Sequence, residues 1–254
     1  MKNLDMKKID KNVIIPKLFF AILFSCLFVI LTQLNMIPLF GMEMNFSAGI
    51  FFGPVIARLI GIPFGIGSIL LAQLIGSYLG YYEYSSILSL VGFFPILFGG
   101  IYFSRMFKSD KRILVIPLAC MILFNLHPIG REVWYYSLFW LIPIIITKFK
   151  DKFDKILKRD FFKTFFYALG TVFTDHAVGS VIYLWALNIP AQFWIMALPI
   201  SPIERLFMAG GVTVTYTLMK KPLEVMQKAF VRKAIAIASV QKQKEVNKIV
   251  QQSS

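Results

Sequence analysis

The side chains best suited to chemistry lie in the last third of the chain, where Asp175, His176, Glu204 and Arg205 interrupt or border two long apolar runs. An ionisable group at the centre of a bilayer costs about 3 kcal/mol, so such groups normally face an ionic partner or a water-filled cavity. Together they can bind a polar solute or relay a proton. The alternative is a buried structural network in which Asp175 pairs with Arg205 or Arg58.

The sequence Ser201-Pro202-Ile203-Glu204 predicts that a last membrane helix begins here and runs over about 202–220. Serine can cap the helix, proline suits its first turn, and glutamate can reach back to the cap. Glu204 is then either a capping residue or part of a site. Arg205 points elsewhere around the helix, as a ligand contact, a gating contact, or a snorkelling or ion-paired side chain.

A second candidate region is the segment 125–136, NLHPIGREVWYY, which separates two short apolar runs. Pro128 and Gly130 break helix, and the aromatic residues that follow suit a membrane interface. One interpretation is an outer rim that supplies His127 and Arg131 to a ligand. The other is an ordinary polar loop with an aromatic anchor.

The sequence predicts no metal site, disulfide or cofactor. His176 beside Asp175 lacks a third ligand at suitable spacing, and Cys26 and Cys120 lie in apolar runs without a CxxC spacing. Walker A, GxSxG and HExxH motifs are also absent from the sequence. We therefore expect a protein without catalytic activity of its own.

Composition indicates the elements that must position these residues. The chain of 254 residues is 57% hydrophobic and 16% charged, with 26 Phe, so it has too few polar side chains to cover a soluble globule. We expect an all-α, polytopic transmembrane bundle of about six spanning helices plus short or re-entrant segments. Up to eight apolar runs are present, at about 14–33, 46–62, 64–82, 86–104, 113–126, 133–148, 161–187 and 200–220.

The net charge of +14 predicts topology rather than nucleic-acid binding, because Lys and Arg form short clusters between the apolar runs. These clusters lie in the N-terminal tail, at 105–112, at 148–163 and from Lys220 onwards. The pattern predicts a multi-pass protein of the cell membrane, with both termini in the cytoplasm and a retained first helix.

Two regions are expected: a transmembrane bundle over 1–221 and a cytoplasmic tail over 222–254. The tail keeps apolar residues at helical spacing among Lys and Arg. It is typical of a basic amphipathic helix that lies on anionic membrane lipids or against a partner. A solvated helical extension is the alternative.

Several features together resemble the substrate-binding S components of energy-coupling-factor vitamin transporters. They are the small residues Ala21 and Ser25 in the first helix, a Gly- and Pro-containing hairpin over 53–67, the run FFPILFGGIYFSRMFK, and a last helix opening SPIER. The resemblance implies that Ala21 and Ser25 contact a coupling transmembrane subunit, which works with a pair of ATPase subunits. It also implies that Asp175, His176, Arg205 and Arg131 lie near the substrate. That family usually has six helices, whereas eight apolar runs are read here.

The first functional hypothesis is therefore a small-molecule binding and uptake subunit, for a vitamin-like solute or a metal, energised by separate ATPase partners. The second is an intramembrane enzyme acting on a lipid-linked or head-group substrate. In it, Asp175, His176 and the HPIGRE loop would serve as acid, base and anion clamp. The third is a non-enzymatic membrane scaffold that uses its basic tail.

Overall fold

Helices make up about 86% of the computed structural model, which describes residues 2–38, 45–82 and 91–253. The all-α class predicted from composition is confirmed. A short antiparallel hairpin of β1 (Asn35–Pro38) and β2 (Asn45–Ser47) follows the first helix. The α-helices described are α1 (Lys2–Thr32), α2 (Gly49–Ile60), α3 (Ile62–Tyr78), α5 (Phe94–Met106), α6 (Val115–Leu126), α7 (Pro128–Glu132), α8 (Leu141–Lys148), α9 (Lys150–Ile156), α10 (Asp160–Leu187), α11 (Ala191–Ala197) and α12 (Ser201–Ser253).

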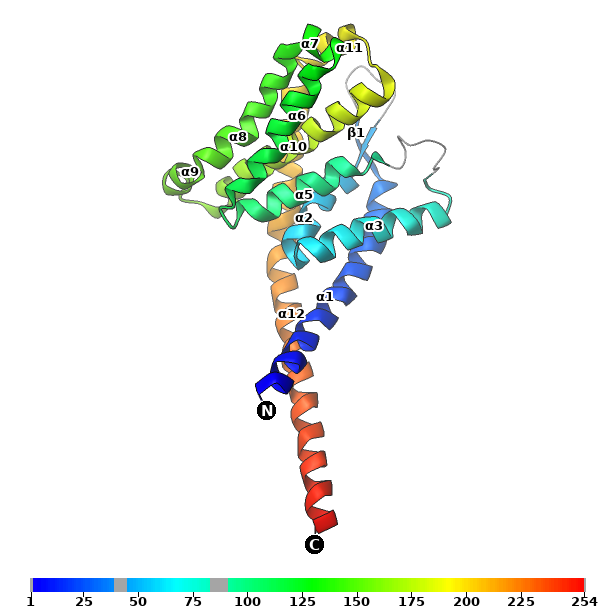
Figure 1. Cartoon of the computed structure of the whole chain (residues 1–254), viewed down its shortest axis with the longest axis vertical. Coiled ribbons are helices and arrows are strands. Elements are labelled where there is room, and N and C mark those ends of the chain that lie inside the picture. The colour runs from blue at the N-terminus through cyan, green and yellow to red at the C-terminus, as the bar shows by residue number, and fades with distance from the viewer. Residues whose placement is uncertain (1, 39–44, 83–90, 254) are drawn as a thin grey trace.

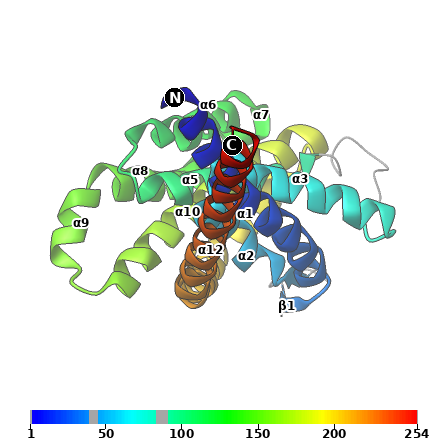
Figure 2. The same cartoon turned by 90° about the horizontal axis from the view of Figure 1, so that it is seen from below.

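The helices form a body from which α1 and α12 extend toward one end, where both termini lie (Figure 1). The short helices α7 and α11 lie at the opposite end. Seen from below, α12 lies near the centre, with α9 and α3 on opposite sides (Figure 2). The helix α10 is central to the packing, because it contacts α5, α6, α8 and α12.

Fewer helices are long enough to cross a bilayer than the sequence predicted. Within 2–38, 45–82 and 91–253, two helical segments have the length and apolarity of a span: Ile14–Thr32 and Asp160–Leu187. A third appears if α11 and the first part of α12, bent by 59°, count as one span. By length and composition, these helices do not provide the roughly six spans that we expected. Part of the fourth apolar run lies outside the described residues.

The shorter runs are broken by local backbone structure. Gly61, with φ of 98°, separates α2 from α3, and only glycine adopts this region of φ readily. The fifth and sixth runs each begin with a 3-10 segment, η1 (Lys111–Leu114) and η2 (Trp134–Trp140). Each run therefore contains an α-helix shorter than the roughly 20 residues that a bilayer requires.

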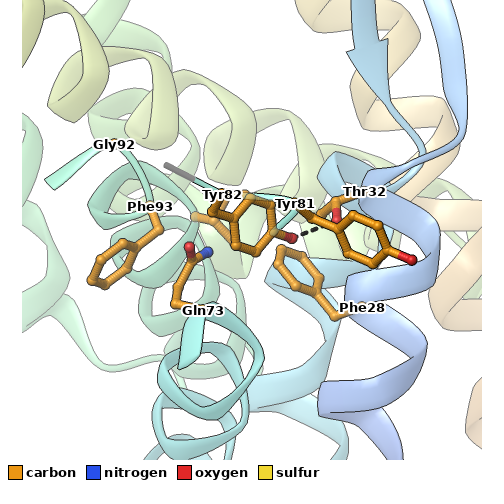
Figure 3. Close-up of a pocket in the computed structure, with 8 residues that line it drawn as sticks. Phe28, Thr32, Gln73, Tyr81, Tyr82, Gly92 and Phe93 are labelled. Atoms are coloured by element: carbon orange, nitrogen blue, oxygen red, sulfur yellow. Dashed lines mark hydrogen bonds between the residues drawn. The ribbon is translucent and has the colours of Figure 1, made fainter. Parts of the chain in front are cut away.

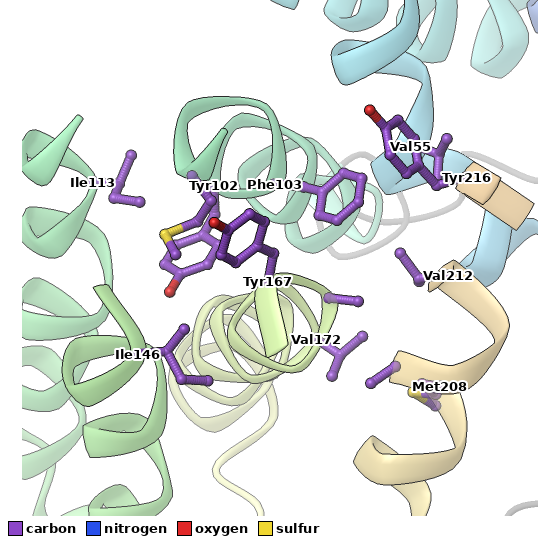
Figure 4. Packing of buried hydrophobic residues seen from close by; sticks show 13 residues of the cluster. Val55, Tyr102, Phe103, Ile113, Ile146, Tyr167, Val172, Met208, Val212 and Tyr216 are labelled. Atoms are coloured by element: carbon purple, nitrogen blue, oxygen red, sulfur yellow. The ribbon is translucent and has the colours of Figure 1, made fainter. Parts of the chain in front are cut away.

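The main core cluster joins α5, α10 and α12 (Figure 4). Tyr102 is completely buried there, and its hydroxyl donates to Pro143 O at 2.9 Å and lies 2.8 Å from Thr147 Oγ1. An added Cβ at Gly170 would collide with the Tyr102 ring. A glycine on α10 is therefore needed for α5 to approach this closely.

The small residues of α1 pack inside the chain. Ser25 Oγ lies 2.7 Å from Ala21 O and 2.8 Å from Ser68 O on α3, and both Ala21 and Ser25 are buried. The surface that the resemblance assigns to a coupling subunit is thus covered by α3. The exposed face of α1 carries large apolar side chains, namely Leu18, Phe19, Ile22, Leu23 and Ile30.

Ion pairs hold the basic segments in place. Asp110 accepts from the side chains of Arg105 and Arg112, and these hydrogen bonds hold the pKa of its carboxyl well below the usual range. Lys150 Nζ lies 2.5 Å from Asp154 Oδ2. These contacts stabilise the connection that precedes α6 and the helix α9 that follows α8.

The last helix continues through Pro222 to Ser253 without interruption. Residues 222–253 of the expected tail therefore belong to the same helix as the last apolar run. At 53 residues α12 is roughly 80 Å long, which explains why it projects so far from the body in Figure 1.

Candidate functional site

Polar residues from three separate elements meet at the α11 end of the molecule. His176 lies in the middle of α10, Ser201 and Arg205 lie in the first turns of α12, and Tyr136 lies in η2. All four are buried. With Asp175 and Glu204 they form what we call the polar cluster.

Tyr136 links the three elements. Its hydroxyl lies 2.9 Å from His176 Nε2 and 2.9 Å from Ser201 Oγ. A phenol can donate one hydrogen bond and accept another, so it can serve both partners at once. Its ring packs against Phe124 and Trp194, which fixes where the hydroxyl points.

Members of the polar cluster interact electrostatically. The guanidinium of Arg205 acts electrostatically on both Asp175 and His176. Its Nη1 also lies 3.0 Å from Met208 Sδ. The side chains of Glu204 and Arg205 are only 8% and 9% exposed, so α12 brings two oppositely charged groups into the interior.

Asp175 has a buried carboxylate oxygen, Oδ1, without a hydrogen-bond partner among the described residues. Asp175 also forms no ion pair within 4.0 Å with any of them. His176 Nδ1 is likewise buried without a partner in the described part of the chain. Because buried polar atoms are nearly always hydrogen-bonded, orphaned ones require an explanation. Together they leave one strong acceptor and one imidazole nitrogen available to a ligand.

The contacts of Arg58 bear on the expected pairing of Asp175 with Arg205 or Arg58. The guanidinium of Arg58 lies over the Phe107 ring, 4.4 Å from its centroid. Among the described residues Asp175 forms no ion pair with Arg58, whereas Arg205 acts on it electrostatically. Asp175 also lies beside Gly99 of α5, where an added Cβ would be 3.3 Å from Asp175 Cβ.

The start of α12 differs in detail from the expected capping box. The helix begins at Ser201, close to the predicted position. The backbone N–H of Glu204 donates to Ile200 O at 3.1 Å, while Ser201 Oγ contacts Tyr136. Ser201 thus contributes to the polar cluster.

His127 and Arg131 differ in their surroundings, because His127 is buried and Arg131 is exposed. His127 is buried, with Nε2 3.0 Å from Asn188 Oδ1 and its ring 5.0 Å from that of Trp185. It joins α7 to the end of α10. Arg131 is exposed on α7 and forms no ion pair with a described residue. A place for these two residues in a ligand site remains a prediction.

A pocket of about 370 Å³ lies elsewhere, between α1, α3 and the start of α5 (Figure 3). Another hollow lies on α12 beside Glu224, Gln227, Lys228 and Arg232. Within the described residues, no group of three or more His, Cys, Asp or Glu side chains could hold a metal ion.

Comparison with known proteins adds a relative without assigning a function. The chain is 30% identical over 162 residues to an uncharacterized protein from Methanocaldococcus jannaschii. The match covers 61% of this chain and 54% of the relative, so the chain spans about half the length of that protein. No family model matches the chain, and no solved structure matches it.

Proposed function

We propose that this protein is the membrane-embedded, substrate-binding subunit of a small-molecule uptake transporter, similar to an energy-coupling-factor S component. The polar cluster would hold the solute, and a separate coupling subunit with two ATPase subunits would supply the energy. Both termini would lie in the cytoplasm. The cluster, near α11 and away from the termini, would then face outward (Figure 1).

The observation that carries this proposal is the buried Oδ1 atom of Asp175, which has no hydrogen-bond partner among the described residues. In a structural network most buried polar atoms are satisfied, because an unmade hydrogen bond in the interior costs about 1–3 kcal/mol. A solute that donates an N–H or O–H to this oxygen would recover that cost. Arg205 and His176 beside it would orient the remaining polar groups of the solute.

The placement of the side chains in the polar cluster also supports a binding role. Tyr136 fixes one nitrogen of His176, so only Nδ1 remains for a ligand. Rigid placement on α10, α12 and η2 suits selective binding, because the side chains are already ordered before the solute arrives. The adjacent Arg205 and Asp175 carry opposite charges, which favours a polar solute with both donors and acceptors.

Ligand-dependent thermal stabilisation of the protein in nanodiscs tests the proposal. We expect at least one solute from a panel of vitamins, their precursors and divalent metal ions to raise the Tm of the wild type. Asp175→Asn should retain the fold and lose most of that shift, because the amide cannot replace the charged acceptor. Asp151→Asn, on the exposed surface of α9, is the matched control and should behave as the wild type.

The same preparation separates the competing hypotheses. Turnover of a phosphorylated lipid that depends on Asp175 and His176 would support an intramembrane enzyme. A ligand shift that persists fully in Asp175→Asn would place the solute elsewhere and contradict the assigned site.

A further inference from the structure

The helix α9 and the residues on either side of it present exposed cations and exposed apolar side chains together. Over residues 148–163 the chain has seven basic and three acidic side chains. This segment lies at the end of α8 and α10 that is opposite α7 and α11, away from both termini (Figure 1). We propose that it is a docking surface for the anionic headgroups of a lipid bilayer. The proposal rests on the membrane placement proposed above, and not on transport.

One face of α9 is fixed to the body by specific contacts. Lys150 Nζ lies 2.5 Å from Asp154 Oδ2 and 5.1 Å from the centroid of the Tyr167 ring. The Tyr167 hydroxyl donates to Asp154 Oδ1 at 2.5 Å. Phe153 stacks on Phe166 of α10, with the ring centroids 5.2 Å apart. These contacts give α9 one orientation, so its other face is held away from the body.

Four large apolar side chains of the segment are exposed. Phe149 and Ile156, at the two ends of α9, are 44% and 65% exposed. They are seven positions apart, which is close to two helical turns, so they lie on the same side of the helix. Phe161 and Phe162, in the first turn of α10, are 45% and 46% exposed. Side chains of this kind insert at the boundary between lipid headgroups and acyl chains.

Exposed cations lie between these apolar side chains. They are Lys148, Lys152, Lys155, Lys158 and Arg159. None of these five forms an ion pair within 4.0 Å with a described residue, whereas Lys150 and Lys163 each pair with an aspartate of the segment. Asp151 is the remaining acidic side chain over 148–163. The exposed surface of the segment therefore carries an excess of positive charge.

The combination of charge and apolarity defines the partner. A soluble anion such as inorganic phosphate would serve the cations and leave the four apolar side chains in water. An anionic bilayer serves both, because the acyl boundary accepts the apolar groups while long basic side chains reach the headgroup phosphates.

The place of α9 in the fold agrees with this partner. The helix α9 ends at Ile156, and α10 begins at Asp160. Residues Asp160–Leu187 have the length and apolarity of a membrane span. If α10 crosses a bilayer, α9 lies where that span meets the membrane surface. In the view from below, α9 lies at the outer edge of the body, where a membrane surface could reach it (Figure 2).

Hydrogen–deuterium exchange of the full chain in nanodiscs tests this surface. Nanodiscs of phosphatidylcholine alone are compared with nanodiscs of phosphatidylcholine mixed with phosphatidylglycerol, by following the peptide that covers residues 149–158. We expect this peptide to exchange at least about threefold more slowly in the mixture. About 0.5 M salt should remove most of the difference, because it screens exposed charges.

Two double variants divide the contributions of charge and apolarity. Lys152→Gln with Lys155→Gln should lose most of the protection by phosphatidylglycerol, and Phe149→Ser with Ile156→Ser should lose at least about half of it. The matched control is Lys220→Gln with Lys221→Gln, which removes the same charge from exposed positions on α12. It should be protected as the wild type.

Three results would overturn the proposal. They are equal exchange of the peptide in both kinds of nanodisc, equal protection of the wild type and Lys152→Gln with Lys155→Gln, and equal protection by soluble glycerol 1-phosphate in phosphatidylcholine nanodiscs. Unchanged exchange of α10 shows that a variant is folded. If Lys152→Gln with Lys155→Gln does not fold, Lys148→Gln with Lys158→Gln decides in its place.

Two measurements separate a failure of this surface from a failure of the proposed function. Release of the chain from membranes by alkaline carbonate would overturn both the membrane placement and this surface. The Asp175-dependent rise in Tm should persist in Lys152→Gln with Lys155→Gln, because those lysines lie on α9 and outside the polar cluster. A failure at α9 alone therefore leaves the proposed solute site standing.

Discussion

At the scale of single residues, Tyr136 determines the geometry of the polar cluster. It is the residue whose hydroxyl contacts both α10 and α12, through His176 and Ser201. The sequence placed Tyr136 only in an aromatic interface belt. Its role depends on contacts 40 and 65 positions away along the chain, which no local pattern encodes.

Replacing Tyr136 by Phe should destabilise the protein by about 1–3 kcal/mol, because it leaves two buried polar partners without their shared hydrogen bond. Chemical denaturation in detergent, followed by circular dichroism, measures the change. Tyr135→Phe is the control, because no hydrogen bond of its hydroxyl is found among the described residues. Equal stability of Tyr136→Phe and the wild type would show that the hydroxyl does not support the cluster.

Asp154 gives a prediction about pH. Burial by itself would raise the pKa of its carboxyl, but hydrogen bonds from Lys150 and Tyr167 outweigh burial and lower it below 3.8. A lowered folded-state pKa stabilises the fold above the unfolded value, and this contribution is lost as the pH falls through the folded value. The wild type should therefore lose more Tm than Asp154→Asn between about pH 5 and about pH 2.

The control for this experiment is Asp151→Asn, since Asp151 lies exposed on the same helix. It should follow the wild type across the whole range. Parallel pH curves for the wild type and Asp154→Asn would mean that the contact with Lys150 does not contribute to stability.

At the scale of elements, α2 and α12 approach closely at Gly211, the second of two adjacent glycines, Gly210 and Gly211. A Cβ added at Gly211 would collide with the Phe51 ring, whereas one at Gly210 meets nothing within 4 Å. The two positions share a helix and a residue type, so they differ only in what they face.

Gly211→Ala should lower stability by about 1–3 kcal/mol through overpacking. Gly210→Ala should leave it unchanged or raise it by about 0.5–1 kcal/mol, because alanine loses less backbone entropy in a helix. Thermal unfolding of the two variants in the same detergent checks the pair. A loss at Gly210 equal to that at Gly211 would contradict the packing described for α2 and α12.

The helical class could be predicted from the apolar runs. The start of the last helix could be predicted from Ser201-Pro202. Both are properties of the local sequence. The convergence of Asp175 and His176 with Arg205 was inferred from the cost of placing charge in apolar surroundings. The number of spans could not be predicted, because apolarity alone does not reveal a 3-10 segment such as Trp134–Trp140. The pocket between α1, α3 and the start of α5 was missed because it joins residues far apart in the chain, such as Thr32 and Tyr82, which are 50 positions apart.

The packing of α1 also bears on assembly. A small-residue step indicates that a helix docks closely, but not which helix it meets. In this molecule Ser25 meets Ser68 O of α3. A separate subunit could reach Ala21 and Ser25 only if α1 and α3 came apart, so the exposed apolar face of α1 is the more accessible surface for a partner.

At the scale of the whole molecule, the polar cluster lies near α11 in a helical protein, and both termini lie at the other end (Figure 1). The long helix α12 connects the two, because its first turns carry Arg205 and its last described turns reach the C-terminal end. One helix therefore joins the polar cluster to the end of the molecule where both termini lie.

Co-purification of the tagged chain from membranes of its own organism, with mass spectrometry of the recovered proteins, tests the central claim most directly. If the chain is the substrate-binding subunit of an uptake transporter, we expect a second multi-pass membrane subunit and two ATPase subunits with Walker A motifs, recovered in amounts comparable to the chain. Recovery of the chain alone, under conditions in which the Asp175-dependent ligand shift persists, would contradict its role as a subunit energised by separate ATPases.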